Sequence, residues 1–129
     1  MTTSTTKKIF VVDGSRFSTL AEAAEEFTQV LGFTMPWNGN FDDFSDLLFW
    51  HTIDDGFILI WRHSDISRQR LGYGETLLWL EERVQHCRAC SVAHWQKQID
   101  AARRQEGDTV FDTIVYFIRN HADIELRLE

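Results

Sequence analysis

The stretch FILIW, residues 57–61, is a continuous apolar run in a polar setting. The turn-forming residues DDG (54–56) precede it, and Arg62 follows it. A strand without polar alternation is typical of parallel sheets, in which helices cover both faces. We therefore expect residues 57–61 to form a strand that is covered on both sides.

Two further segments of the sequence have strand patterns. Residues 8–12 (KIFVV) form a short apolar run that the turn pair Asp13-Gly14 stops, and this predicts a buried strand. Residues 123–129 (DIELRLE) alternate apolar and charged side chains with a period of two. This alternation predicts a strand with one face in water.

Helical spacing of apolar residues fills the interval between the first two strands. A helix is expected from Ser18, which can cap it, to a stop at Gly32. The next helix is expected to follow Asn40 as its cap. Its inward stripe consists of Phe41, Phe44, Leu47 and Leu48.

The second half of the chain is expected to be mostly helical. Residues 62–74 (RHSDISRQRLGYG) are polar, so we expect a connection there, with one helical turn over residues 67–71. Helices are expected over residues 75–87 and 92–105, and a last helix after Thr109 as its cap. Strands separated by helices indicate an α/β domain with a small, mostly parallel sheet.

The length and composition fit an ordinary globular protein. A chain of 129 residues can form one domain around one core. No apolar run reaches the roughly 18 residues of a membrane span, and the polar start MTTSTTKK lacks the apolar part of a secretion signal. Cys87 and Cys90 are too few and too close to staple such a fold. We therefore expect a cytoplasmic protein with free thiols and no membrane contact.

The negative charge is concentrated in one region. The net charge is −7, yet residues 17–61 contain eight acidic residues and no Lys or Arg. The rest of the chain therefore sums to +1, since −8 and +1 give −7. This layout favours a basic partner protein and argues against nucleic acid. The alternative is a solvated acidic surface that only keeps the protein in solution.

Common enzyme motifs are absent from the sequence. Gly72-Tyr73-Gly74 is a lone GxG without the third glycine of a dinucleotide loop, and no G-x-S-x-G elbow occurs. The five histidines are scattered, and each is expected to lie at the surface or fill the core. We therefore expect neither an enzyme nor a bound cofactor.

One short segment combines side chains that bind metals. Residues 86–94 (HCRACSVAH) contain two thiols and two imidazoles, and Cys87, Cys90 and His94 would share one face of a helix. Zn²⁺ uses such ligands, but they usually come in two pairs about a dozen residues apart. Buried cysteines or a redox CxxC pair are therefore favoured over a zinc site.

The helix after Asn40 carries an unusual acidic face. Asp42 and Asp43 lie in its first turn, where carboxylates favour the helix dipole by about 0.3–1 kcal/mol. Asp46 lies four residues after Asp42, where like charges oppose the helix by a few tenths of a kcal/mol. A face that costs stability indicates a use in binding.

The order of these segments matches a known pattern. A strand and turn at residues 7–14 precede an aromatic-rich loop at 36–40 (PWNGN) and the acidic helix, whose residues fit the motif Asn-Leu-Asp-Ala-Leu followed, after one residue, by Asp. With Trp61-Arg62 and the closing IELRL (124–128), this order resembles the barstar family of ribonuclease inhibitors. The residues in register with the motif are Asn40, Phe41, Asp42, Phe44, Asp46 and Leu48.

The resemblance spans the chain except for an insertion at about residues 66–108. It implies a single domain over residues 1–129, with a small three-stranded parallel sheet flanked by helices and a helical insertion. It also implies an inhibitor that blocks a ribonuclease active site with its acidic helix and the preceding loop. Asp42 and Asp46 would then replace phosphate charge against Arg, Lys and His side chains of the enzyme.

The resemblance also implies a set of partner-binding residues. Ser45 and Asn120 stand where the family's namesake has a tryptophan and an acid. Trp37 and Trp50 are added because they lie near enough in the sequence to supply other contacts, although each could be core or rim. The full set is Trp37, Asn38, Gly39, Asn40, Asp42, Ser45, Asp46, Trp50 and Asn120.

Three function hypotheses follow from the sequence. The first is a cytoplasmic inhibitor of a basic ribonuclease. The second is a non-inhibitory module of the same family that binds another basic protein, with the insertion as a second surface. The third is a zinc-bound or redox protein that uses Cys87, Cys90 and His94.

Overall fold

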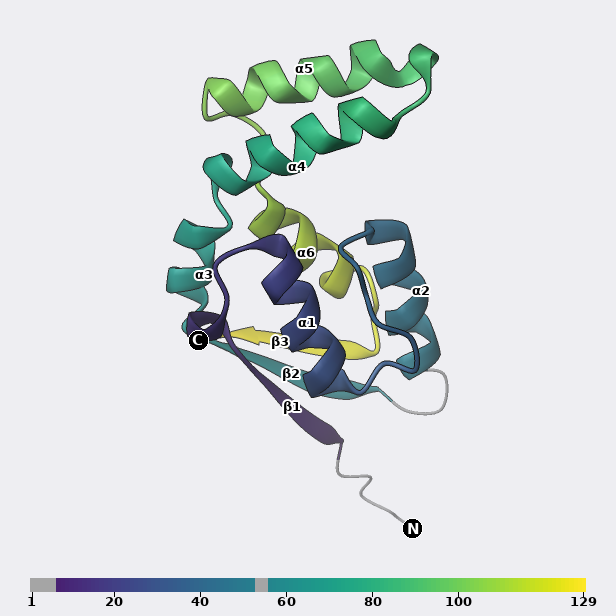
Figure 1. Cartoon of the computed structure of the whole chain (residues 1–129). Helices are drawn as coiled ribbons and strands as arrows, with labels where there is room; N and C mark the ends of the chain where they lie inside the picture. The colour runs from purple at the N-terminus through teal and green to yellow at the C-terminus, as the bar shows by residue number, and fades with distance from the viewer. Residues whose placement is uncertain (1–6, 53–55) are drawn as a thin grey trace.

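The computed structural model describes residues 7–52 and 56–129, and its sheet has three strands that are all parallel (Figure 1). In spatial order they are β1 (Lys8–Asp13), β2 (Phe57–Arg62) and β3 (Ile124–Leu128). The predicted parallel sheet of three strands is confirmed. The predicted turn residues Asp54 and Asp55 lie outside the described ranges.

Three helices pack on one face of this sheet. They lie on the same side of the strands in Figure 1, and they are α1 (Leu20–Leu31), α2 (Phe41–His51) and α6 (Val110–Arg119). The side chains of Phe57, Leu59 and Trp61 alternate with partly exposed ones and are buried. The core therefore forms between β2 and these helices.

The opposite face of the sheet is open, so the prediction that residues 57–61 are covered on both sides is wrong. Ile58 and Ile60 are only half-buried there, and Ile9, which pairs with Ile58, is 57% exposed. The reason is topological. Right-handed crossovers that add parallel strands in one direction keep their helices on one face.

Helix ends follow the capping residues of the sequence. Gly32 ends α1 in the left-handed conformation (φ 67°), as predicted, but the N-cap is Thr19 and not Ser18. The Thr19 side chain accepts from the backbone N–H of Glu22, while the Glu22 carboxylate accepts from the N–H of Ser18. Ser18 therefore stands one position before the cap. Thr109 caps α6 as predicted, in a reciprocal capping box with Asp112.

The segment after β2 is more helical than predicted. α3 (Ser64–Arg70) begins two residues after the strand, where one turn at 67–71 was expected. Its buried positions are two serines, Ser64 and Ser67, which bind the backbone of other elements. Because its buried side is polar, apolar spacing could not reveal this helix.

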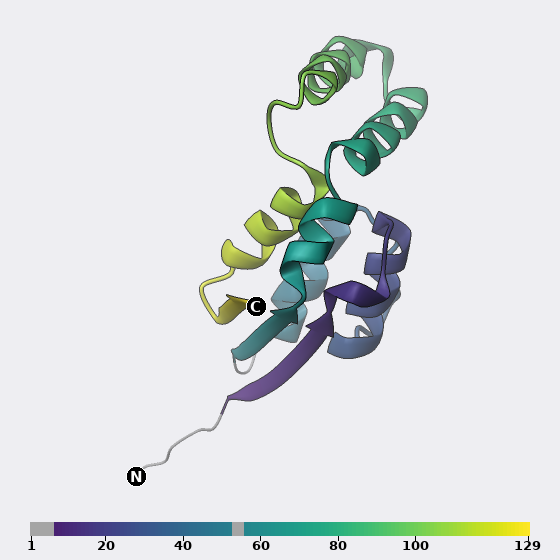
Figure 2. The same cartoon turned by 90° about the vertical axis from the view of Figure 1, so that its left-hand side faces the viewer.

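A helical hairpin extends away from the sheet (Figure 2). It consists of α4 (Tyr73–His86), a short 3-10 turn η2 (Ala89–Ser91) and α5 (Val92–Arg103). Leu80, Ile99 and Ala102 form its own small core. The Tyr73 hydroxyl donates to the Gly107 carbonyl (2.9 Å) and thereby ties the two ends together. The two predicted helices are present, with bounds shifted by one or two residues.

The helices are short. The longest helix in the described part of the chain, α4, has 14 residues. Within residues 7–52 and 56–129, no helix combines the length and the apolar character that crossing a membrane would require.

A close backbone approach explains the glycine that follows β1. A Cβ on Gly14 would lie 2.7 Å from the His63 carbonyl oxygen and 2.8 Å from that of Arg62, and still closer to the Ser67 hydroxyl. We expect Gly14→Ala to lower the free energy of unfolding by about 1–3 kcal/mol, as overpacking does. Gly74→Ala is the matched control, because a Cβ at Gly74 in α4 meets no atom within 4 Å. Urea denaturation of both variants measures the difference. An equal stability of the two would contradict the packing argument.

A carboxylate at the end of β1 gives a pH prediction. The hydroxyl and backbone N–H of Ser15, together with His63, hold the pKa of Asp13 at about 2. Because the pKa of Asp13 is lowered, its carboxylate stabilises the fold at pH values above the ordinary pKa near 3.8. This stabilisation is lost as the pH falls toward 2. We expect Asp13→Asn to melt below wild type at pH 7, by a modest margin because the side chain is 37% exposed. The gap should close between about pH 4 and pH 2, and a gap independent of pH would refute the charge effect.

Candidate functional site

The loop before α2 is fastened to α1. The backbone N–H of Trp37 donates to the Thr28 hydroxyl (3.0 Å), which donates in turn to the Ala24 carbonyl (2.7 Å). The Trp37 indole is 3% exposed and stacks on Phe44 of α2, with ring centroids 4.1 Å apart. Its N–H donates to the Asn40 carbonyl (2.7 Å). One side chain thus fixes the end of the loop against two helices.

Asn40 starts α2 at a fixed position. Its side-chain oxygen accepts from the backbone N–H groups of Asp42 (2.9 Å) and Asp43 (3.3 Å), as the predicted cap requires. Its own N–H donates to the side chain of Asn38 (3.2 Å). Gly39 between them has φ 96°, a conformation that a side chain would strain. The first turn of α2 is therefore well ordered where its acids begin.

The acids of α2 are exposed and unneutralised. Asp42, Asp43 and Asp46 all face solvent. No described Lys, Arg or His makes an ion pair with them. The segment that contains them, residues 17–61, has no Lys or Arg, and the first basic residue after it is Arg62. Such a face can bind cations from another molecule at little cost in competing contacts.

A pocket of about 500 Å³ lies beside this acidic face. Asp43 and Asp46 line it from α2, together with Trp50, which is 66% exposed. The loop supplies apolar side chains on the other side, among them Met35, which is 69% exposed. The His51 ring nitrogen binds the Leu31 carbonyl at the same end of the helix. The pocket therefore combines carboxylates with uncovered apolar surface.

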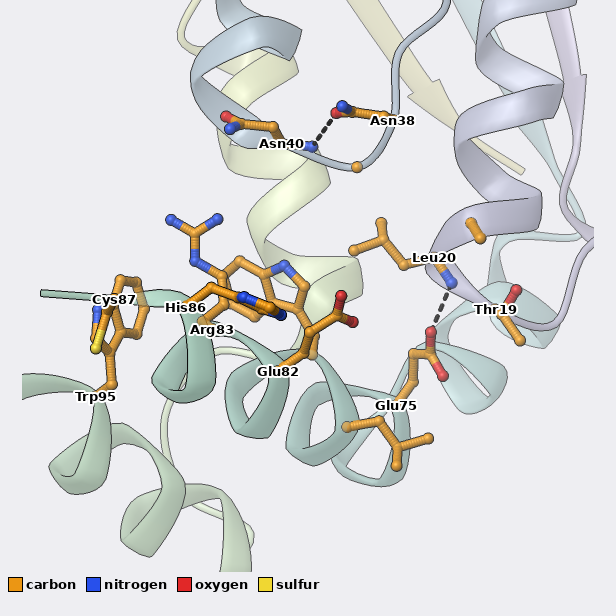
Figure 3. Close-up of a pocket in the computed structure, with 14 residues that line it drawn as sticks. Thr19, Leu20, Asn38, Asn40, Glu75, Glu82, Arg83, His86, Cys87 and Trp95 are labelled. Carbon is orange, nitrogen blue, oxygen red and sulfur yellow. Dashed lines mark hydrogen bonds between the residues drawn. The ribbon is translucent and has the colours of Figure 1, made fainter. Parts of the chain in front are cut away.

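A second groove, of about 680 Å³, separates the loop from the hairpin (Figure 3). Asn38, Gly39 and Asn40 line one side, and the start of α1 lies next to them. Residues of α4 line the other side, and the Glu75 carboxylate accepts from the backbone N–H of Leu20 (2.7 Å) across it. The loop that the resemblance assigns to partner binding thus has a cavity on its hairpin side.

A comparison with protein-family models identifies the family of the chain. A model described as "Barstar (barnase inhibitor)" matches residues 7–110. The chain belongs to the barstar family. No curated protein matches it. The match confirms the resemblance inferred from the loop and the acidic helix. The family description is that of an enzyme inhibitor and not of an enzyme.

The residues expected to bind a partner fall into three groups by their exposure. Asn38, Asp42, Asp46, Trp50 and Asn120 are exposed. Trp37 and Gly39 are buried, and Asn40 and Ser45 are half-buried. Trp37 is thus a core residue that shapes the loop, while Trp50 stands at the rim of a pocket.

Asn120 lies apart from the loop in the sequence but on a helix next to α2. It is the C-cap of α6, and Phe117 on that helix stacks on Phe41 at the start of α2. Tyr116, one helical turn before Asn120, is 63% exposed. Tyr116 lies off the apolar stripe of α6, and this position in the sequence could have indicated that its side chain is exposed.

Other exposed residues near the candidate site were also absent from the set expected from the sequence. Asp43 lines the same pocket as Asp46, although the sequence explains it fully as a helix-start residue. Leu78 in α4 is 65% exposed and lines the groove. No local sequence signal places it there, because the contact between hairpin and loop joins distant segments.

The segment with cysteines and histidines does not form one helix. Cys87 follows α4, Cys90 lies in η2 and His94 lies in α5. Across the described ranges, no three His, Cys, Asp or Glu side chains are grouped so that they could hold a metal ion. The shared helix face on which the sequence would place Cys87, Cys90 and His94 is therefore not formed.

The two tryptophans of the site should differ sharply in their effect on stability. We expect Trp37→Ala to lower the free energy of unfolding by about 3–5 kcal/mol, because it empties a core position. Trp50→Ala should change it by no more than about 0.5 kcal/mol, because its side chain is largely in water. Urea denaturation of both variants tests this. A large loss for Trp50→Ala would show that its exposed position is wrong.

Proposed function

We propose that the chain is a cytoplasmic inhibitor of a basic ribonuclease and blocks the enzyme's active site with α2 and the preceding loop. The observation that carries the proposal is the exposed, unneutralised acidic face of α2 in a member of the barstar family. Asp42 and Asp46 are the central residues of the proposed interface. The chain itself would supply no catalytic group.

The physical basis is charge complementarity. A ribonuclease active site holds phosphates with cationic side chains, and carboxylates can occupy the same positions. Opposite charges first accelerate association, and pairs that lose water in the complex then slow dissociation. The capped first turn holds Asp42 in place before binding, which reduces the entropy that binding costs.

Trp50 and Asp43 support a broader contact than two aspartates. Both line the pocket beside Asp46, and exposed tryptophan is a side chain that often anchors interfaces. A cationic side chain of the enzyme could pack on the indole and pair with the carboxylates. The half-buried Ser45 between the acids contributes little area.

The second candidate is a non-inhibitory module for another basic protein. Two substitutions support it, because Ser45 and Asn120 replace a tryptophan and an acid of the family's namesake. Such a module would keep the acidic face and bind its partner without blocking an RNA-cleaving site. Enzyme inhibition, measured apart from binding, separates the two candidates.

The decisive measurement is the cleavage of RNA by barnase, the enzyme that the family description names, with increasing amounts of this protein. We expect inhibition by wild type and a loss of about 2–5 kcal/mol of binding free energy for Asp46→Ala, the usual result of removing one partner of a buried charge pair. Asp42→Ala should act in the same direction. Glu25→Ala is the control, since Glu25 is an exposed acid on α1 within the same acidic segment.

Two results would count against the proposal. Unchanged RNA cleavage by barnase and by other guanyl-preferring ribonucleases in the presence of wild type would refute inhibition. Equal weakening of binding by Glu25→Ala and Asp46→Ala would mean that the acidic residues only attract a basic partner over a long range and make no specific contact with it. High salt checks that second result, because it screens exposed charges beyond about 10 Å at 0.1 M.

A further inference from the structure

The hairpin is held in a fixed position beside the proposed binding loop. Trp79 of α4 packs edge-on against Phe41, the first residue of α2, with ring centroids 5.4 Å apart. The Thr76 hydroxyl accepts from the buried N–H of Val110 (2.9 Å), and Glu75 binds the N–H of Leu20. Three contacts to three different helices thus orient α4. α4 therefore forms one fixed side of the candidate site.

One stripe of α4 faces the groove along most of the helix. Leu78, Glu82 and His86 are spaced by four residues, so they follow one another along one side of α4. All three line the groove and all three are exposed. We call them the hairpin stripe. A leucine that is 65% exposed in such a place is uncovered apolar surface next to a proposed interface.

The charges in the groove suit a basic partner. The guanidinium of Arg83 lies over the rings of Trp79 (5.5 Å) and Trp95 (5.0 Å), so the one arginine of the groove is held against aromatic surface. Glu75 is engaged by the Leu20 N–H. Glu82 is exposed and takes part in none of the ion pairs between described residues. Of the two carboxylates that line the groove, Glu82 is therefore the one that remains available to a cation.

The size of a typical interface brings the hairpin stripe within reach. α2 has 11 residues and is therefore about 16 Å long at 1.5 Å per residue. A standard interface covers about 800 Å² on each partner, or a patch about 28 Å across. A protein centred on α2 and its loop must extend past them. On the hairpin side, Asn38 and Asn40 share the groove with Leu78 and Glu82.

We propose that the hairpin stripe is a second contact surface for the same basic ribonuclease that α2 binds, and that it selects among such enzymes. This inference rests on the proposed function. Leu78 covers an apolar part of the enzyme beside its active site, and Glu82 pairs with a Lys or Arg there. Enzymes with an acid or a bulky loop at this place bind less tightly.

The experiment compares charge reversals one residue apart. Glu82→Lys and Glu81→Lys both change an exposed glutamate of α4, but Glu81 does not line the groove. With barnase as the probe, inhibition of RNA cleavage gives the affinity. We expect Glu82→Lys to weaken the affinity about tenfold and Glu81→Lys less than about twofold. Both reversals change the net charge, and hence the long-range steering, by the same amount, so the difference reports the local contact of Glu82. Leu78→Ala should weaken it about threefold or more. Thermal melting confirms that all variants fold.

The outcomes separate the two proposals. If wild type inhibits barnase and Asp46→Ala abolishes the inhibition while Glu82→Lys and Leu78→Ala match wild type, the second surface is refuted and the inhibitor stands. Equal weakening by Glu81→Lys and Glu82→Lys also refutes it. If wild type inhibits neither barnase nor other guanyl-preferring ribonucleases, both proposals fall. Additive losses in the double variant Asp46→Ala with Glu82→Lys support two separate contacts with the enzyme.

Discussion

The buried indole of Trp61 sets the arrangement of the elements around it. Trp61 is fully buried at the end of β2, and its N–H donates to the Ser67 hydroxyl (2.9 Å). A buried N–H without an acceptor would cost about 1–3 kcal/mol. Ser67 in turn donates to the Gly14 carbonyl (3.1 Å). α3 must therefore begin directly after β2, and the turn after β1 must come close enough to exclude a Cβ at Gly14.

This core extends to both sides of the candidate site. Phe27 of α1 packs against Trp61 (5.3 Å) and against Trp37 (6.2 Å), which carries the loop before α2. On the other side, α3 leads into α4, and the Leu71 carbonyl between them accepts from the Phe111 N–H (3.2 Å). The loop and the hairpin are thus both placed relative to one tryptophan. A groove between two such walls is formed before a partner arrives, which lowers the cost of binding.

Much of this fold follows from local sequence rules. Asn40 and Thr109 cap helix starts with their side chains, and Gly32 ends a helix because it has no side chain, all as the sequence predicts. Such caps can be predicted because capping depends on neighbours in the chain. The errors have nonlocal causes. α3 escapes detection because its buried side chains are serines that bind Gly14 and Glu129. The open sheet face depends on crossover handedness, which an apolar run cannot reveal.

The site shows the same division. Asp46 could be singled out because like charges four residues apart oppose a helix, and the structure shows how α2 tolerates them. Asn40 satisfies two backbone N–H groups of the first turn, and each such cap contributes about 1 kcal/mol, more than the repulsion of a few tenths. Trp37 and Trp50 could not be assigned from sequence, because one precedes α2 and the other lies in its last turn, and only the contacts of the loop with α1 and α2 show that the first is buried. Loop geometry therefore decides which aromatic side chain remains available to a partner.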